Sequence, residues 1–244
     1  MTDLTYDLNQ APPRRMGLIV LKTDEVIERE VSEILPVADD VRLHVSRIFF
    51  PTDVTSDTLG QMELNLPASA SLLPDVPFDV IGYGCTSGAT VIGPDRIRDL
   101  IATTCDTAAV CDPMTSVIDA AHHLGARKIG VVTPYIPSVS NAICERLEAH
   151  DLKISGFGSF GILQDPDVAR VTPASIKDAI IGIGRSDCDA VFVSCTNLAV
   201  LSVIAEAESA IGKPVLSSNQ ALAWAMCQSA GIAPKNKFGR LFET

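Results

Sequence analysis

The stretch FDVIGYGCTSG at Phe78–Gly88 decides the fold, because it joins an apolar run to a cysteine and two hydroxyl side chains. A similar stretch, CDAVFVSCTNL, follows at Cys188–Leu198, and in both an aspartate stands six residues before a cysteine that precedes a threonine. The segment RMGLIV at 15–20 is likewise matched by KIGVVT at 128–133. The two pairs are offset by 110 and 113 residues. This indicates an internal repeat of roughly 110 residues, with a cysteine at the end of a matching strand in each half.

The composition limits the class of protein. The 244 residues suit one or two domains with a sizeable core, and 47% apolar and 20% charged residues are ordinary for a globular protein. A formal net charge of −11 argues against binding to nucleic acid, because phosphate contacts need clustered Lys and Arg. An anionic substrate would have to be held by local dipoles against the field of the whole chain.

The N-terminal residues and the cysteines bear on localisation. No apolar run is long enough to span a bilayer. Residues 1–13 carry acids without an apolar core, so we expect a flexible tail there rather than a signal peptide. Seven cysteines, an odd number, do not suit a disulfide framework and favour a reducing, cytoplasmic compartment.

Short apolar runs alternate with helical patterns along the chain. The predicted strands are 16–21, 41–49, 76–83, 128–132, 154–161, 190–194 and 214–217. The predicted helices are 25–35, 52–73 with an interruption at Pro67, 95–103, one within 111–126, 139–150, 173–185, 197–211 and 220–229. The predicted loops are the cysteine turn 85–87, an exit loop at 133–135 and a polar loop at 164–171. This alternation predicts parallel sheets with right-handed crossovers.

We therefore predict an α/β fold of two similar lobes, each a parallel sheet flanked by helices, related by a pseudo-twofold axis. Lobe 1 is expected at 14–115, completed by 216–244, and lobe 2 at 116–215. Ligands of such sheets bind at the carboxyl ends of the strands, where both cysteine turns fall. The active site is thus expected in the cleft between the lobes.

The residues of the two turns suggest the chemistry. A cysteine just before a helix lies near the positive end of the helix dipole, so we expect lowered pKa values for Cys85 and Cys195. Backbone N–H groups at helix N termini bind carboxylates. Neighbouring side chains add candidate donors: Thr86, Ser87, Tyr135, Thr196 and Asn197. Two facing thiols suit a proton transfer through an enediolate, in which one sulfur removes an α-proton and the other returns one without a cofactor.

Three motifs carry a family resemblance: GCTSG at 84–88, VTPY at 132–135 and SCTN at 194–197. Through them the chain resembles the aspartate/glutamate racemase superfamily. Within it, the chain is most similar to the branch of maleate cis-trans isomerases, arylmalonate decarboxylases and racemase-like proteins of ectoine utilisation. The resemblance runs from Met16 to the closing GRLF at 239–242, and it implies a homodimer.

The resemblance also assigns roles. It matches Cys85 and Cys195 to the two cysteines of the isomerases, and Tyr135 to the family tyrosine. The decarboxylases have glycine at the first cysteine position and keep a Thr-Ser pair, which matches Thr86 and Ser87 here. The chain has both thiols as well as the hydroxyl pair, which weighs against simple decarboxylation.

Two departures from the maleate isomerases concern the substrate. The asparagines with which those enzymes bind substrate fall at Asp24 and Asp165 in this chain. Because carboxylates repel a dicarboxylate, we expect a substrate that carries an amino or ammonium group, such as an amino acid or an N-acyl diamino acid from ectoine breakdown. Structural alternatives stay open for both residues, since Asp24 also suits a helix N-cap and Asp165 a turn.

The leading interpretation is a cofactor-independent racemase or isomerase that acts on a small carboxylic or amino acid through Cys85 and Cys195, without metal, nucleic acid or membrane. One alternative keeps the site but changes the reaction, to cis-trans isomerisation through a covalent Cys85 adduct or to decarboxylation with Cys195 as proton donor. Another is a non-catalytic ligand-binding protein. Tyr135 also suits a packing role over its loop, and the five other cysteines are expected to pack as small apolar residues.

Overall fold

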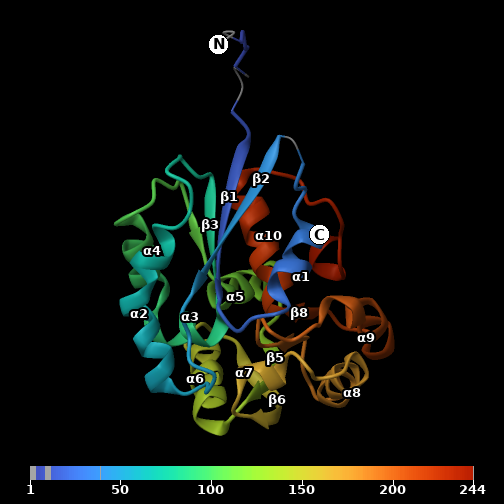
Figure 1. Ribbon diagram of the computed structural model, residues 1–244. Helices are drawn as coiled ribbons and strands as arrows, with labels where there is room; N and C mark the ends of the chain where they lie inside the picture. The colour runs from blue at the N-terminus through green and yellow to red at the C-terminus, as the bar shows by residue number, and fades with distance from the viewer. Residues whose placement is uncertain (1–3, 9–11, 39, 244) are drawn as a thin grey trace.

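The computed structural model describes residues 4–8, 12–38 and 40–243. It contains two parallel four-stranded sheets, in the strand orders β2-β1-β3-β4 and β6-β5-β7-β8. Both sheets have the same order of strands along the chain, so the sequence repeat is a repeat of topology, and the predicted two-lobed α/β fold is confirmed (Figure 1). Of the predicted tail, residues 1–3 and 9–11 lie outside the described residues, and 4–8 are exposed.

The elements follow one another in the predicted alternation of strands and helices. The first half contains β1 (Arg14–Leu21), α1 (Ile27–Ile34), β2 (Val41–Ile48), α2 (Ser56–Ala70), β3 (Val80–Gly84), α3 (Thr86–Ile92), α4 (Pro94–Ala102), β4 (Val110–Cys111) and α5 (Pro113–His123). The second half contains β5 (Lys128–Tyr135), α6 (Pro137–Glu148), β6 (Lys153–Ile162), α7 (Asp165–Val168), α8 (Pro173–Gly184), β7 (Ala190–Val193), the 3-10 turn η1 (Leu201–Val203), α9 (Ile204–Ile211), β8 (Val215–Ser217), α10 (Ser218–Ala230) and the 3-10 turn η2 (Arg240–Phe242).

The central strands are buried on both faces, as their continuous apolar sequences predict. All of β3 is buried, and so is β1 from Met16 onward. Helix α1 covers the first sheet with an apolar stripe formed by Ile27, Val31 and Ile34. No helix within the described ranges has the length and apolar character to cross a membrane.

Three predictions of local structure are wrong. Pro67 does not interrupt α2: the 15-residue helix continues through it to Ala70, although the proline has no N–H to donate. The predicted exit loop 133–135 belongs to β5, because pairing with β6 resumes at Tyr135–Ile162 beyond an irregularity. The predicted polar loop 164–171 contains the short helix α7.

The segments after the two cysteines differ from each other and from the prediction. Thr86 and Ser87 form the first turn of α3 rather than a separate turn, with Cys85 as the N-cap. After Cys195 the chain is not helical until η1, so the predicted helix from Asn197 is wrong over its first turn. Helix α10 begins at Ser218 with Ser217 as its N-cap, two residues before the predicted start at 220.

Helix α10 links the two lobes. It starts directly after β8, the edge strand of the second sheet, and then packs against α1, α5 and β3 of the first half. Figure 1 shows α10 beside α1, away from β6 and α8. The C-terminal segment therefore returns to the first sheet, and its N-terminal residues lie at the boundary between the sheets.

The two aspartates of the repeat align the central strands. The carboxylate of Asp79 accepts the N–H of Arg15 at 2.7 Å, and that of Asp189 accepts those of Arg127 and Lys128 at 2.8 and 2.7 Å. In each lobe, the aspartate that precedes the strand leading to the cysteine thus accepts hydrogen bonds from the backbone at the start of the central strand. These hydrogen bonds lower the pKa of Asp189.

We predict that Asp189→Ala lowers the free energy of unfolding by about 1 kcal/mol at neutral pH, a value kept low because water screens the exposed carboxylate. Because the folded pKa is lowered, the stabilisation is present above the unfolded pKa and disappears as the pH falls through the folded pKa. Urea unfolding at pH 7 and pH 3 measures it. Asp187→Ala is the matched control, since its ion pair with Lys128 is exposed, and an equal loss in both variants would contradict the prediction.

Candidate active site

The first cysteine lies at the start of α3. As the N-cap of this helix, Cys85 accepts the backbone N–H of Gly88 on its Sγ at 3.2 Å, and the Ser87 hydroxyl lies 3.7 Å from the same sulfur. Gly88 allows this close approach: a Cβ there would lie 2.6 Å from the Tyr83 hydroxyl and 3.0 Å from the sulfur. The second glycine of GCTSG is therefore required by the position of the thiol.

The second cysteine is held by a different backbone geometry. Cys195 has a φ of 122°, a region that non-glycine residues rarely adopt and that often marks functional sites. Its Sγ accepts the N–H of Asn197 at 3.3 Å. The two thiols thus share one feature, a sulfur that accepts a backbone N–H from a residue just ahead in the chain.

Ser218, the first residue of α10, joins the two cysteine segments. Its Oγ accepts the hydroxyl of Thr86 at 2.7 Å and the backbone N–H of Cys195 at 3.0 Å. Ser218 was not among the site residues predicted from the sequence. The available signal was its position directly after an apolar strand, at the same sheet edge as the cysteines.

Tyr135 completes the predicted cluster. Its hydroxyl interacts electrostatically with the side chains of Ser87, Cys85 and Cys195. Burial raises the pKa of Tyr135 well above its usual value, so the phenol stays a neutral hydrogen-bond donor. The structure therefore brings Cys85, Ser87, Tyr135 and Cys195 together at the end of β5.

The predicted lowering of the thiol pKa values is wrong for this closed site. Cys85 and Cys195 are each only 3% exposed. Burial raises the pKa of Cys85 to about 12 against the opposing effect of the Gly88 N–H and the Ser87 hydroxyl, and it raises that of Cys195 well above its usual value. Desolvation of the charged form therefore outweighs the hydrogen bonds and the helix terminus, and both thiols carry protons at neutral pH.

Two buried acids lie beside the thiols. Asp24 accepts the N–H groups of Val26 and Ile27 at 2.8 and 2.9 Å, just ahead of α1, whose N-cap residue is Val26. Asp165 accepts the hydroxyl of Thr23 at 2.6 Å. Burial raises the pKa of both, to about 6 for Asp24, and both carboxylates raise the pKa of the two thiols.

The remaining predicted donors are bound to protein groups. Asn197 donates to the carbonyl and carboxylate of Asp165 at 3.0 and 3.1 Å and accepts the N–H of Glu25 at 2.9 Å. Thr196 donates to the carbonyl of Gly84 at 3.4 Å. The bonds to Glu25 and Gly84 cross between the lobes, whereas those to Asp165 lie within lobe 2. Asn197 and Thr196 thus hold the site together, and their predicted substrate contacts stay a prediction.

Glu30 is a further buried residue that the sequence analysis missed. It lies on α1, 1% exposed, and accepts the N–H of Leu201 and the side-chain amide of Asn219, both at 2.8 Å. The same amide of Asn219 donates to the carbonyl of Thr196 at 2.8 Å. Burial raises the pKa of Glu30 to about 7. An acid of lobe 1 therefore holds the backbone that follows Cys195.

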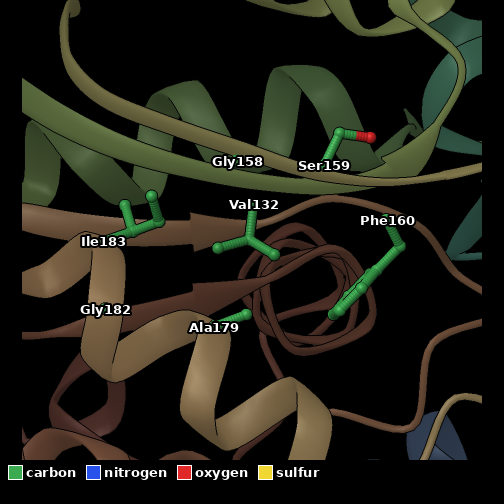
Figure 2. Close-up of a pocket in the computed structure, with 7 residues that line it drawn as sticks. All are labelled: Val132, Gly158, Ser159, Phe160, Ala179, Gly182 and Ile183. Carbon is green, nitrogen blue, oxygen red and sulfur yellow. The ribbon is translucent and has the colours of Figure 1, made fainter.

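A separate pocket of about 260 Å³ lies between β5, β6 and α8. Figure 2 shows its lining, which is mostly carbon: Val132, Gly158, Ser159, Phe160, Ala179, Gly182 and Ile183. It contains none of the predicted site residues and no ionisable group, so we do not assign the reaction to it. Among the described residues no group of three or more His, Cys, Asp or Glu is arranged to hold a metal ion.

Two parallel α/β lobes of the same topology, with a buried cysteine from each at their boundary, define the fold class of this chain. The family model of arylmalonate decarboxylase matches residues 64–242, and the chain belongs to this family. The resemblance predicted from the sequence motifs is thereby confirmed.

Curated relatives and solved structures agree with this assignment. The maleate isomerase of Pseudomonas putida is 25% identical over 90% of this chain and 93% of its own. The arylmalonate decarboxylase of Bordetella bronchiseptica is 32% identical over 56% of this chain and 59% of its own. A crystal structure of a Pseudomonas putida maleate isomerase superposes with a TM-score of 0.84 at 24% identity, covering 94% of this chain and 98% of that one. A Nocardia farcinica maleate cis-trans isomerase mutant, solved with a covalently bound succinylcysteine intermediate, gives 0.80 at 24% identity, with 94% and 98% covered.

We predict that Glu30 makes the stability depend on pH. Because the pKa of Glu30 is raised in the folded state, this residue makes its full contribution to the free energy of unfolding below the unfolded pKa of 4.5. That contribution is lost as the pH rises through about 7. Wild type should therefore lose on the order of 3 kcal/mol more than Glu30→Gln across this range. Urea unfolding at pH 4.5 and pH 8 tests this, with the exposed Glu206→Gln as control. Equal pH dependence in wild type and Glu30→Gln would contradict it.

Proposed function

We propose that this protein is a cofactor-independent isomerase of a small unsaturated carboxylic acid, with Cys85 as the nucleophile. The observation that supports this most is the convergence of two buried thiols with the Tyr135 phenol and the Ser87 hydroxyl in one closed site. Similarity to maleate isomerases over nine-tenths of the chain adds support for isomerisation rather than for the two-thiol racemisation that leads the sequence interpretation.

The proposed reaction conserves atoms and electrons within substrate and thiol. The Cys85 sulfur forms a bond to one alkene carbon, the π-electron pair moves toward the substrate carboxylate, and the thiol proton passes to an oxygen of that carboxylate. Hydrogen bonds from Ser87 and Tyr135 stabilise the resulting enediolate. Rotation about the former double bond, now single, is followed by loss of the sulfur, which restores the alkene as the trans isomer and returns the proton to Cys85.

A second candidate is the two-thiol proton transfer between the faces of an α-carbon, which would make the protein a racemase of an amino or carboxylic acid, such as one of ectoine breakdown. The observation that favours it is the symmetry of the sulfurs, since each accepts a backbone N–H, from Gly88 or Asn197, that can stabilise a thiolate. Decarboxylation, the activity named by the family, needs only one thiol, so the second cysteine counts against it.

We predict that Cys85→Ser lowers cis-trans isomerisation at least about 1000-fold, because the alcohol is a far weaker nucleophile than the thiol. The substrates are maleate, maleamate and cis-4-aminobut-2-enoate, and product is followed by proton NMR. Cys144→Ser is the control, since this thiol lies on α6 outside the site, and it should keep wild-type rates. Isomerisation that persists in Cys85→Ser would overturn the role of the nucleophile.

We predict a covalent adduct on Cys85 in Cys195→Ser, found by peptide mass spectrometry as a gain of one substrate mass. The racemase candidate predicts the opposite pattern: exchange of the α-proton of amino acids in heavy water, abolished in either cysteine variant, and no adduct. Neither adduct nor exchange with any of these compounds would remove both candidates and leave ligand binding as the function.

A further inference from the structure

Two buried carboxylates next to the thiols form a subsite that protein groups leave incomplete. Asp24 and Asp165 are each 2% exposed. From their contacts we propose that they bind a cationic group, so that the substrate is a small carboxylic acid carrying an ammonium. This inference deepens the proposed function and rests on it for the position of the reacting carbons.

The first observation is an oxygen without a partner. Asp24 uses Oδ1 to accept the N–H groups of Val26 and Ile27, whereas its buried Oδ2 accepts no hydrogen bond. The nearby Thr196 side chain lowers the pKa of Asp24, but its hydroxyl donates to the carbonyl of Gly84. Buried polar atoms are nearly always paired, so each exception calls for an explanation. Two further unpaired atoms, Ser194 Oγ and Asn219 Oδ1, belong to residues that flank the Cys195 segment. Unpaired acceptors therefore gather at this site.

The second observation is that no basic side chain faces the two acids. Among the described residues, neither Asp24 nor Asp165 forms a salt bridge. Arg47 comes near but donates to the backbone carbonyl of Asp24 at 3.0 Å, and its ion pair is with Glu28. A buried carboxylate is usually compensated by a cation, and here two lie close enough to repel each other.

The third observation is the position of the acids relative to the chemistry. Both carboxylates act on Cys85 and Cys195 through space, and Asp165 is fixed by Thr23 and Asn197. Asn197 in turn supplies the N–H that holds the Cys195 sulfur. The acids thus interact with both thiols and pair with no protein cation, so a substrate ammonium bound near the thiols would meet the unpaired oxygen of Asp24.

Charge then separates the candidate substrates. A zwitterion can place its carboxylate at the hydroxyl donors Ser87 and Tyr135 and its ammonium between the two acids, where charge-assisted hydrogen bonds are strong. A dicarboxylate would place its second charge against Asp24 and Asp165 and be repelled. Metal capture is less suited, because no third His, Cys, Asp or Glu completes a site within the described chain.

The test is a comparison of two ligands that differ in one group. Cis-4-aminobut-2-enoate carries an ammonium where maleate carries a carboxylate, and isothermal titration in the Cys85→Ser background measures binding without turnover. We expect the amino compound to bind at least about tenfold more tightly at pH 8. In Asp24→Asn/Asp165→Asn we expect the preference to reverse, because amides donate to a carboxylate and offer no charge to an ammonium. Asparagine caps helices as well as aspartate, so Asp24→Asn keeps its bonds to α1.

A matched control comes from Asp112, another buried aspartate, which caps α5 through the N–H of Thr115 and lies outside the site. Asp112→Asn should leave the ligand preference unchanged. Equal or tighter binding of maleate by the parent, or an unchanged preference in the double variant, would overturn the subsite. If the single variant Asp165→Asn alone abolishes the preference with an unchanged circular dichroism spectrum, loss of folding is not the cause.

These measurements test the cationic subsite and the proposed isomerase activity separately. Preferred binding of the amino compound without isomerisation or an adduct on Cys85 would uphold the subsite and remove the isomerase. Isomerisation that favours maleate would uphold the isomerase and remove the subsite.

Discussion

The site depends on one hydroxyl, because Ser218 accepts hydrogen bonds from both cysteine segments at once. Thr86 approaches it from lobe 1 and the N–H of Cys195 from lobe 2. Glu30 and Glu25, in and just before α1, add bonds to the residues that follow Cys195. The two thiols can be held at fixed positions only while these bonds hold, since buried polar networks position their members when every donor is used. The N-terminal turn of α10 is thus the element on which the active-site geometry rests.

Burial governs the electrostatics of this region. The helix terminus and backbone N–H groups act to favour a thiolate, yet both thiols, Tyr135 and the acids have raised pKa values because the charged forms lack water. With Cys85 and Cys195 each 3% exposed, this closed site therefore keeps both thiols protonated at neutral pH.

Much of the fold followed from the sequence. Continuous apolar runs predicted the buried parallel strands, and the offset between GCTSG and SCTN predicted two lobes of equal topology. Errors occurred at Pro67, through which α2 continues, and at Tyr135 in β5, where pairing with β6 overrides the local signal. The absence of helix after Cys195 was also unpredictable, because its backbone is set by contacts from Ser218, far along the chain.

By itself the sequence determined the strands, the repeat and the two cysteines, because periodicity and strand ends are local properties of the chain. Only the tertiary structure decided which polar groups meet: that Ser218 joins the half-sites, that Asn197 binds Asp165, and that Asp24 keeps one oxygen unpaired. The tertiary structure also raises the pKa values of the two thiols, which the sequence predicted to be lowered. Desolvation depends on every group that covers a residue, and those groups come from distant segments that no local pattern identifies.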